Sequence, residues 1–187
     1  MNGATIALIV VAVVGFFLIL LFNRLVGRKN KVLNAFGTVD VLLKKRYDLI
    51  PNLVAAVQGY MQHERTVLQQ ITDLRSRAMA GKLPPEQLFG LNAQLGQLLG
   101  GVRVAIENYP QLKASQNVLQ LQASLNEVEE QISAGRRAYN ATVTDLNNAL
   151  EMFPSNLVGS LFGFQRAAFF EAAEGERAAV PVNMGHP

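Results

Sequence analysis

The sequence predicts an all-α protein, with a single N-terminal transmembrane helix followed by an antiparallel, four-helix-bundle-like domain that contains one long, Pro-kinked helix. Three observations lead to this prediction. Residues 4–22 carry no charge, apolar residues recur at helical spacing downstream, and glycine- or proline-containing turns separate the periodic segments. We therefore expect a transmembrane anchor at 1–23, a helical bundle at 24–174 and a flexible tail at 175–187.

The span from Ala4 to Phe22 is nearly long enough as a helix to cross the ~30 Å hydrocarbon core at about 1.5 Å per residue. A cleavable signal segment is usually shorter and follows basic residues, but no lysine or arginine precedes this span. The segment therefore predicts a membrane helix that is retained.

Four basic residues, Arg24, Arg28, Lys29 and Lys31, follow the span. The positive-inside rule then places the N-terminus outside and the bundle in the cytoplasm. The same side chains are expected to contact anionic lipid headgroups. They also explain the net charge of +3 without a nucleic-acid partner, because no basic face with interleaved aromatics is present.

A single apolar stripe predicts one helix from Lys31 to Ala80. Its width of about three heptad columns suits a helix inside a bundle better than a two-stranded coiled coil. Pro51 lies in the run KKRYDLIPNLV, where it removes a backbone donor and is expected to kink the helix. An uncompensated proline costs a helix roughly 3 kcal/mol, so other contacts must offset it.

Arg46 and Glu64 occupy core columns of this stripe. In one interpretation both lie at helix edges, with their stems packed and their charged groups in water. In the other, Arg46 is a buried, paired residue that fixes the register of the bundle. The residues expected to set kink and register are Arg46, Asp48 and Pro51.

Three further helices are expected after the turn at 81–85. The first covers Glu86–Asn108, the second runs from a cap at Ser115 to Phe153 with an unbroken heptad pattern, and the third covers Asn156 to about Ala173 with Ser155 as its cap. The last region is rich in phenylalanine and lacks charge from Phe153 through Gln165. It is either a helix that covers the bundle or an exposed surface for another chain or the membrane interface. The predicted interaction surface comprises Leu157, Leu161, Phe162 and Phe164.

No residue pattern predicts catalysis, a cofactor or a metal site, and we expect a protein that is not an enzyme. His63-Glu64 begins like a zinc protease motif, but Val67 stands where the second histidine is required. The chain has no cysteine for disulfides or thiolate ligands. Glu127, Glu129 and Glu130 lie off the core columns and are expected to form a solvated acidic face.

Several motifs together resemble the LemA family of bacterial membrane proteins. They include Val39-Asp40-Val41 with KKRYDLIPNLV, Gly59-Tyr60 followed by His63-Glu64, the segment NYPQLKA at 108–114, Arg137-Ala138-Tyr139-Asn140, and FPSNL with LFGF between 153 and 164. The resemblance implies a short external N-terminus, one helix in the bacterial inner membrane and a cytoplasmic antiparallel helical bundle. It implies no catalytic residue.

The first function we expect is a membrane-anchored helical scaffold that self-associates into a higher-order assembly and organises or shapes the membrane. Unequal expected helix lengths motivate this hypothesis, because short connections cannot cover a long apolar stripe within one compact bundle. The alternative is an adaptor that docks a membrane protease or signalling partner through the bundle, at the Phe162–Phe164 surface. Expected partners are membrane lipid and further copies of the chain, with another membrane protein as the partner in the alternative function, but not nucleic acid.

Overall fold

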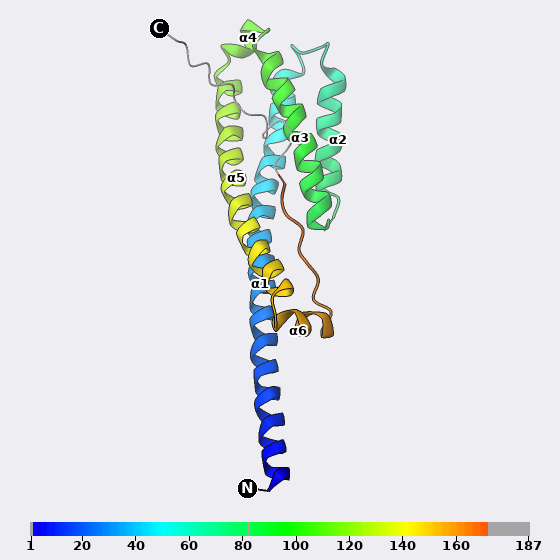
Figure 1. Ribbon diagram of the computed structural model, residues 1–187. Coiled ribbons are helices and arrows are strands. Elements are labelled where there is room, and N and C mark those ends of the chain that lie inside the picture. Colours follow the sequence, from blue (N-terminus) through cyan, green and yellow to red (C-terminus); the bar gives the residue numbers. More distant parts are fainter. Residues whose placement is uncertain (1, 82, 172–187) are drawn as a thin grey trace, which may run out of the picture. The chain divides into compact units, whose positions relative to one another are not determined.

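The computed structural model describes residues 2–81 and 83–171. All regular secondary structure in these residues is helical, which confirms the all-α prediction (Figure 1). The helices are α1 (Gly3–Val57), α2 (Arg65–Met79), α3 (Pro85–Ile106), α4 (Pro110–Lys113), α5 (Gln116–Glu151) and α6 (Ser155–Leu161).

The described chain forms two compact units. The first contains residues 2–42 and Ile132–Phe169, and the second contains Leu43–Gln131 with residues 170–171. The second unit holds the end of α1, the whole of α2 and α3, and the start of α5, which form its bundle of four long helical stretches. The expected boundaries of anchor, bundle and tail stay predictions, and the tail at 175–187 lies outside the described residues.

Helix α1 contains the predicted span, and it is the one helix of the described residues that is long and apolar enough to cross a membrane. Its apolar side chains there are exposed, with Leu8 and Val11 each 72% accessible. Such a surface is unfavourable in water and favourable in hydrocarbon, so the observation agrees with a membrane anchor.

The predicted single helix from Lys31 to Ala80 is wrong, because α1 ends at Val57 and α2 begins at Arg65. The amide groups of Tyr60 and Met61 both donate to the Val57 carbonyl, which closes the helix end. Met61 is fully buried in the connection, and Gly59 has a low helix propensity. The break also removes the helix-length argument for self-association.

Helices α3 and α5 confirm the next two predictions to within two residues at each end. In the second unit, α2 and α3 lie side by side after a short connection (Figure 1). Helix α5 buries most apolar residues of its heptad pattern, namely Val118, Val128, Ile132, Tyr139 and Leu146, but it ends at Glu151, and Phe153 beyond it is 78% exposed.

The predicted last helix to Ala173 is too long, because α6 ends at Leu161. Gly163 has φ +67°, which suits glycine, and the Phe164 amide donates to the Gly159 carbonyl at 2.9 Å. The chain then continues without helix, and the Asn147 side chain exchanges two hydrogen bonds with the Ala167 backbone. The N–H and carbonyl groups of Ala167 thus have a side-chain partner, and the chain does not need to continue as a helix to satisfy them.

Ser155 does not cap α6 as predicted. Its hydroxyl instead points backwards to the end of α5, where its single hydrogen is shared between the carbonyls of Ala149 at 2.6 Å and Met152 at 2.9 Å. Ser155 is the first residue of α6, and Pro154 before it takes the cap position. The hydroxyl therefore contributes to satisfying the carbonyls at and just after the C-terminus of α5.

Candidate functional site

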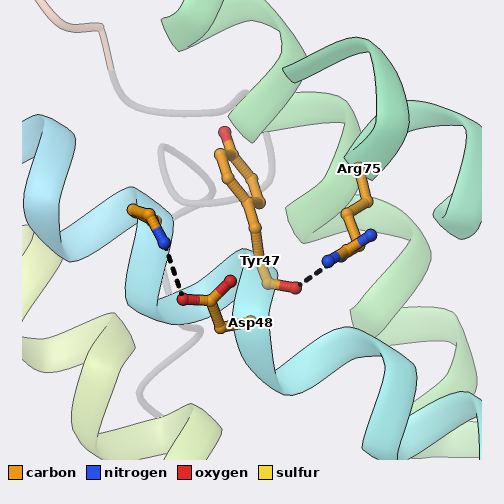
Figure 2. Close-up of polar contacts among 4 residues, drawn as sticks. Tyr47, Asp48 and Arg75 are labelled. Atoms are coloured by element: carbon orange, nitrogen blue, oxygen red, sulfur yellow. Dashed lines mark hydrogen bonds and ion pairs between the residues drawn. The ribbon is translucent and has the colours of Figure 1, made fainter. Parts of the chain in front are cut away.

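Pro51 lies in α1 with an exposed side chain, and the helix continues through it. Because proline has no N–H, the carbonyl of Tyr47 four residues earlier loses its usual helical donor. Arg75 of α2 replaces that donor: its Nε donates to the Tyr47 carbonyl oxygen at 2.9 Å (Figure 2). Tyr47 is only 2% exposed, so water has little access to its carbonyl, and a donor from the protein is needed to satisfy it. The kink itself stays a prediction.

Arg46 is buried, with 6% of its surface exposed. Its Nη1 donates to Asn92 Oδ1 of α3 at 2.9 Å and lies 2.8 Å from Glu129 Oε2 of α5. A Cβ on Gly96 would come within 3.5 Å of Arg46 Nη2, so the guanidinium packs closely against α3. The interpretation of Arg46 as a buried, paired residue therefore describes the structure, while its role in fixing register stays a prediction.

The prediction of a solvated acidic face at Glu127, Glu129 and Glu130 is partly wrong, because Glu129 has a partner in the core. Its side chain is 40% exposed, yet one carboxylate oxygen pairs with the buried guanidinium of Arg46. Glu127 accepts a hydrogen bond from Gln131 on the same exposed face. Heptad columns separate core from surface, but a long side chain at the edge of the core reaches inward from an outer column.

Asp48 makes a surface ion pair with Lys44 at 3.2 Å, one helical turn away (Figure 2). Both side chains are more than half exposed, so this pair contributes little to stability.

Glu64 lies just before α2, where its carboxylate accepts a hydrogen bond from the Tyr109 hydroxyl at 3.0 Å. Partial desolvation and this hydrogen bond to Glu64 raise the pKa of Tyr109.

In the first unit, α6 packs against the end of the predicted span (Figure 1). Leu21 and Leu25 of α1 form a small core with Ala149 of α5 and Val158 of α6. A Cβ on Gly159 would approach Leu150 Cδ2 to 2.8 Å, closer than real contacts allow. Glycine at this position therefore permits the close packing of α6.

The predicted interaction surface lies at this junction. The Phe22 ring is 4.9 Å from the Phe162 ring and 5.8 Å from the Phe164 ring, between centroids, and Lys29 Nζ lies 6.0 Å from the Phe164 centroid. Phe164 is half-buried, whereas the other three predicted residues are exposed: Leu157 by 61%, Leu161 by 75% and Phe162 by 56%. Helix α6 thus covers one face of the unit through Val158 and exposes the opposite face.

The predicted basic residues follow directly on α1. Arg24, Lys29 and Lys31 are exposed, and Arg28 is half-buried. They lie within two and a half turns of Phe22, which places cationic side chains beside an apolar surface. Such a combination is typical of a membrane–water interface.

The sequence alone did not indicate the partners of Arg46, of the Tyr47 carbonyl or of Glu64. Arg75, Asn92 and Tyr109 lie on other segments, and no local pattern marks them as partners of these groups. Pro51 does indicate that the Tyr47 carbonyl needs a new donor, but it does not indicate which helix supplies it. In the described residues, no group of three or more His, Cys, Asp or Glu side chains gathers as a metal site would require.

An all-helical chain with one candidate membrane span, and an apolar surface beside the end of that span in the first unit, define the class of this protein. The chain belongs to the LemA family, whose family model matches residues 35–184. It is 28% identical over 161 residues to the protein LemA of Metamycoplasma hominis, covering 86% of this chain and 74% of that protein.

Two further relatives are named as magnetosome proteins. MamQ 2 of Paramagnetospirillum magneticum is 24% identical over 189 residues, covering 87% of this chain and 70% of that protein. MamQ of Magnetospirillum gryphiswaldense is 22% identical over 191 residues, covering 88% and 70% respectively. The chain is thus a LemA-family membrane protein related to MamQ.

Proposed function

We propose that the protein is a membrane-anchored helical scaffold that self-associates and organises or shapes the membrane. The observation that carries the proposal is an exposed stripe on α1 beyond the span. Leu33 and Val41 are 56% and 57% exposed, and Gly37 lies midway between them. Residues four apart share one helix face, so these three form a continuous stripe.

A second copy of the chain is the occupant that fits this stripe best. A Cβ on Gly37 would meet nothing within 4 Å, so the backbone there is open to close approach by another helix. Two copies inserted the same way in one membrane hold their α1 stripes at the same height. Parallel α1 helices would then bring Leu33, Gly37 and Val41 of both copies together without any adjustment of register.

Self-association predicts an assembly larger than one chain in the membrane. Full-length protein should be extracted from native membranes with its surrounding lipid and sized after lysine-directed cross-linking. We expect a ladder that extends beyond the dimer, because the α1 stripe pairs two copies and the exposed apolar face of α6, with Leu157 and Leu161, offers a second contact through which pairs can join. A protein that stays monomeric both in membranes and in mild detergent contradicts the proposal.

The orientation we propose places the N-terminus outside and the bundle in the cytoplasm, because the four juxtamembrane cations all follow the span. A reporter fused after Pro187 should therefore behave as cytoplasmic. Adding lysines before Ala4 while neutralising the four cations should weaken or invert this preference. Accessibility of the unmodified C-terminus from outside contradicts the orientation.

The exposed face of α6 favours the adaptor as a second candidate function. Leu157, Leu161 and Phe162 present apolar surface that a membrane protease or signalling protein could cover. Gentle solubilisation and pull-down separate the two functions, because a scaffold recovers mainly itself and an adaptor recovers a different protein in fixed stoichiometry. Replacing Leu157 and Leu161 by serine should then abolish recovery of that protein.

A further inference from the structure

The first unit contains a cavity of about 210 Å³ at the end of the predicted span. Arg24 and Arg28 of α1 line it together with Leu21, and Met152 and Phe153 line its other side. The cavity is thus cationic on one side and apolar on the other. Leu21 belongs to both the cavity and the apolar span, so the cavity adjoins the surface that the membrane would cover.

Both guanidinium groups are available for a ligand. Within residues 2–81 and 83–171, neither the Arg24 side chain nor the Arg28 side chain makes a hydrogen bond or an ion pair. None of the described residues that line the cavity is acidic. The nearby carboxylate of Glu151 pairs instead with Arg166 at 2.8 Å. The cavity therefore carries a net positive charge, which favours an anionic ligand.

The size and surroundings of the cavity indicate the kind of anion. Pockets that enclose a drug-sized ligand measure roughly 300–1,000 Å³, so this cavity holds only part of a larger molecule. Two arginines one turn apart offer many N–H donors to phosphate oxygens. The long apolar part of such a ligand can continue along exposed side chains of the span, including Phe17 and Leu20.

We propose that this cavity binds one anionic glycerophospholipid. Arg24 and Arg28 contact its phosphate, the glycerol region enters the cavity, and the acyl chains lie along α1 in the membrane. A zwitterionic headgroup fits less well, because its ammonium would lie beside two guanidinium groups. The inference rests on the membrane anchoring in the proposed function but not on self-association.

Full-length protein in nanodiscs provides the test, with phosphatidylglycerol as the anionic probe and phosphatidylcholine as the neutral lipid. Native mass spectrometry after release from the disc counts the lipid that stays bound. High salt during preparation screens diffuse attraction, so it leaves mainly direct contacts. We expect one retained phosphatidylglycerol, and about a 30-fold loss of its preference over phosphatidylcholine in Arg24→Gln/Arg28→Gln.

Lys29→Gln/Lys31→Gln is the matched control, because it removes the same charge from side chains that do not line the cavity. It should keep most of the lipid preference. Equal losses in the two double variants overturn the proposal, since they indicate diffuse attraction alone. Circular dichroism of both variants should show unchanged helix content, and Arg24→Lys/Arg28→Lys, which keeps the charge, should recover part of the preference.

Two further outcomes separate the possible failures. Inorganic phosphate should not displace the retained lipid, and displacement would overturn the proposal in favour of a soluble phosphate ligand. A chain that enters neutral and anionic nanodiscs but retains neither lipid preferentially overturns the lipid site alone. A chain that enters neither overturns the membrane anchoring as well.

Discussion

Replacing Arg46 by alanine is expected to lower the free energy of unfolding by about 2–4 kcal/mol. The substitution removes the donor of Asn92 and the ion-pair partner of Glu129, and it leaves a space in the core of the second unit. Breaking a fully buried pair costs more, but Glu129 is 40% exposed and water can hydrate its carboxylate. Thermal unfolding of the full-length protein in mild detergent, followed by circular dichroism, measures the loss.

Lys45→Ala is the matched control for Arg46→Ala, because Lys45 is its exposed neighbour on α1. The control should change stability by less than about 0.5 kcal/mol. Arg46→Met keeps most of the packed stem and should cost less than Arg46→Ala, because it fills the space that alanine leaves. A loss in Arg46→Ala no larger than that in Lys45→Ala contradicts the buried pairing.

Arg75→Ala is expected to cost about 1.5–3 kcal/mol, because it leaves the buried Tyr47 carbonyl without the charged donor that replaces the missing N–H of Pro51. The same substitution in a Pro51→Ala background should cost about 1–2 kcal/mol less, since alanine restores a backbone donor to that carbonyl. Pro51→Ala alone should gain little stability, because Arg75 already satisfies the carbonyl.

A double-mutant cycle of these variants, measured as thermal unfolding of the full-length protein, gives the coupling energy directly. Arg77→Ala serves as the control, because Arg77 lies on the same helix with an exposed side chain. It should show no coupling to Pro51→Ala. Equal costs of Arg75→Ala in both backgrounds would show that Arg75 does not compensate for the proline.

The break between α1 and α2 shows why the sequence predicted the buried residues better than the helices. The connection at 58–64 is seven residues long, the length of one heptad. The apolar columns therefore return in the same phase after the turn, and Ile71 and Leu74 are buried as the unbroken pattern predicts. Within the turn the pattern fails at Tyr60, which is 53% exposed, whereas Met61 of the flanking column is buried as predicted.

Only those parts of the candidate site that depend on neighbouring residues in the chain were predictable from the sequence. Local patterns indicated the span, its basic flank and the apolar surface of α6, because each depends on neighbours in the chain. The contacts of Arg46 with Asn92 and Glu129 join residues far apart in sequence, and periodicity does not determine such pairs. The short length of α6 depends on Gly163 and on the Asn147–Ala167 hydrogen bonds, of which only the glycine is visible locally.

Site-specific cross-linking along α1 tests the proposed self-association most directly. The chain has no cysteine, so a single introduced cysteine reports only contacts between copies. Gly37→Cys lies at the centre of the stripe, and Thr38→Cys is also exposed but turned about 100° around the helix. Oxidation in native membranes should give a disulfide-linked dimer with Gly37→Cys and much less with Thr38→Cys, because the bond requires Cα atoms within about 7 Å. Absence of the dimer in Gly37→Cys, or equal yields from the two variants, would contradict a scaffold built through this face of α1.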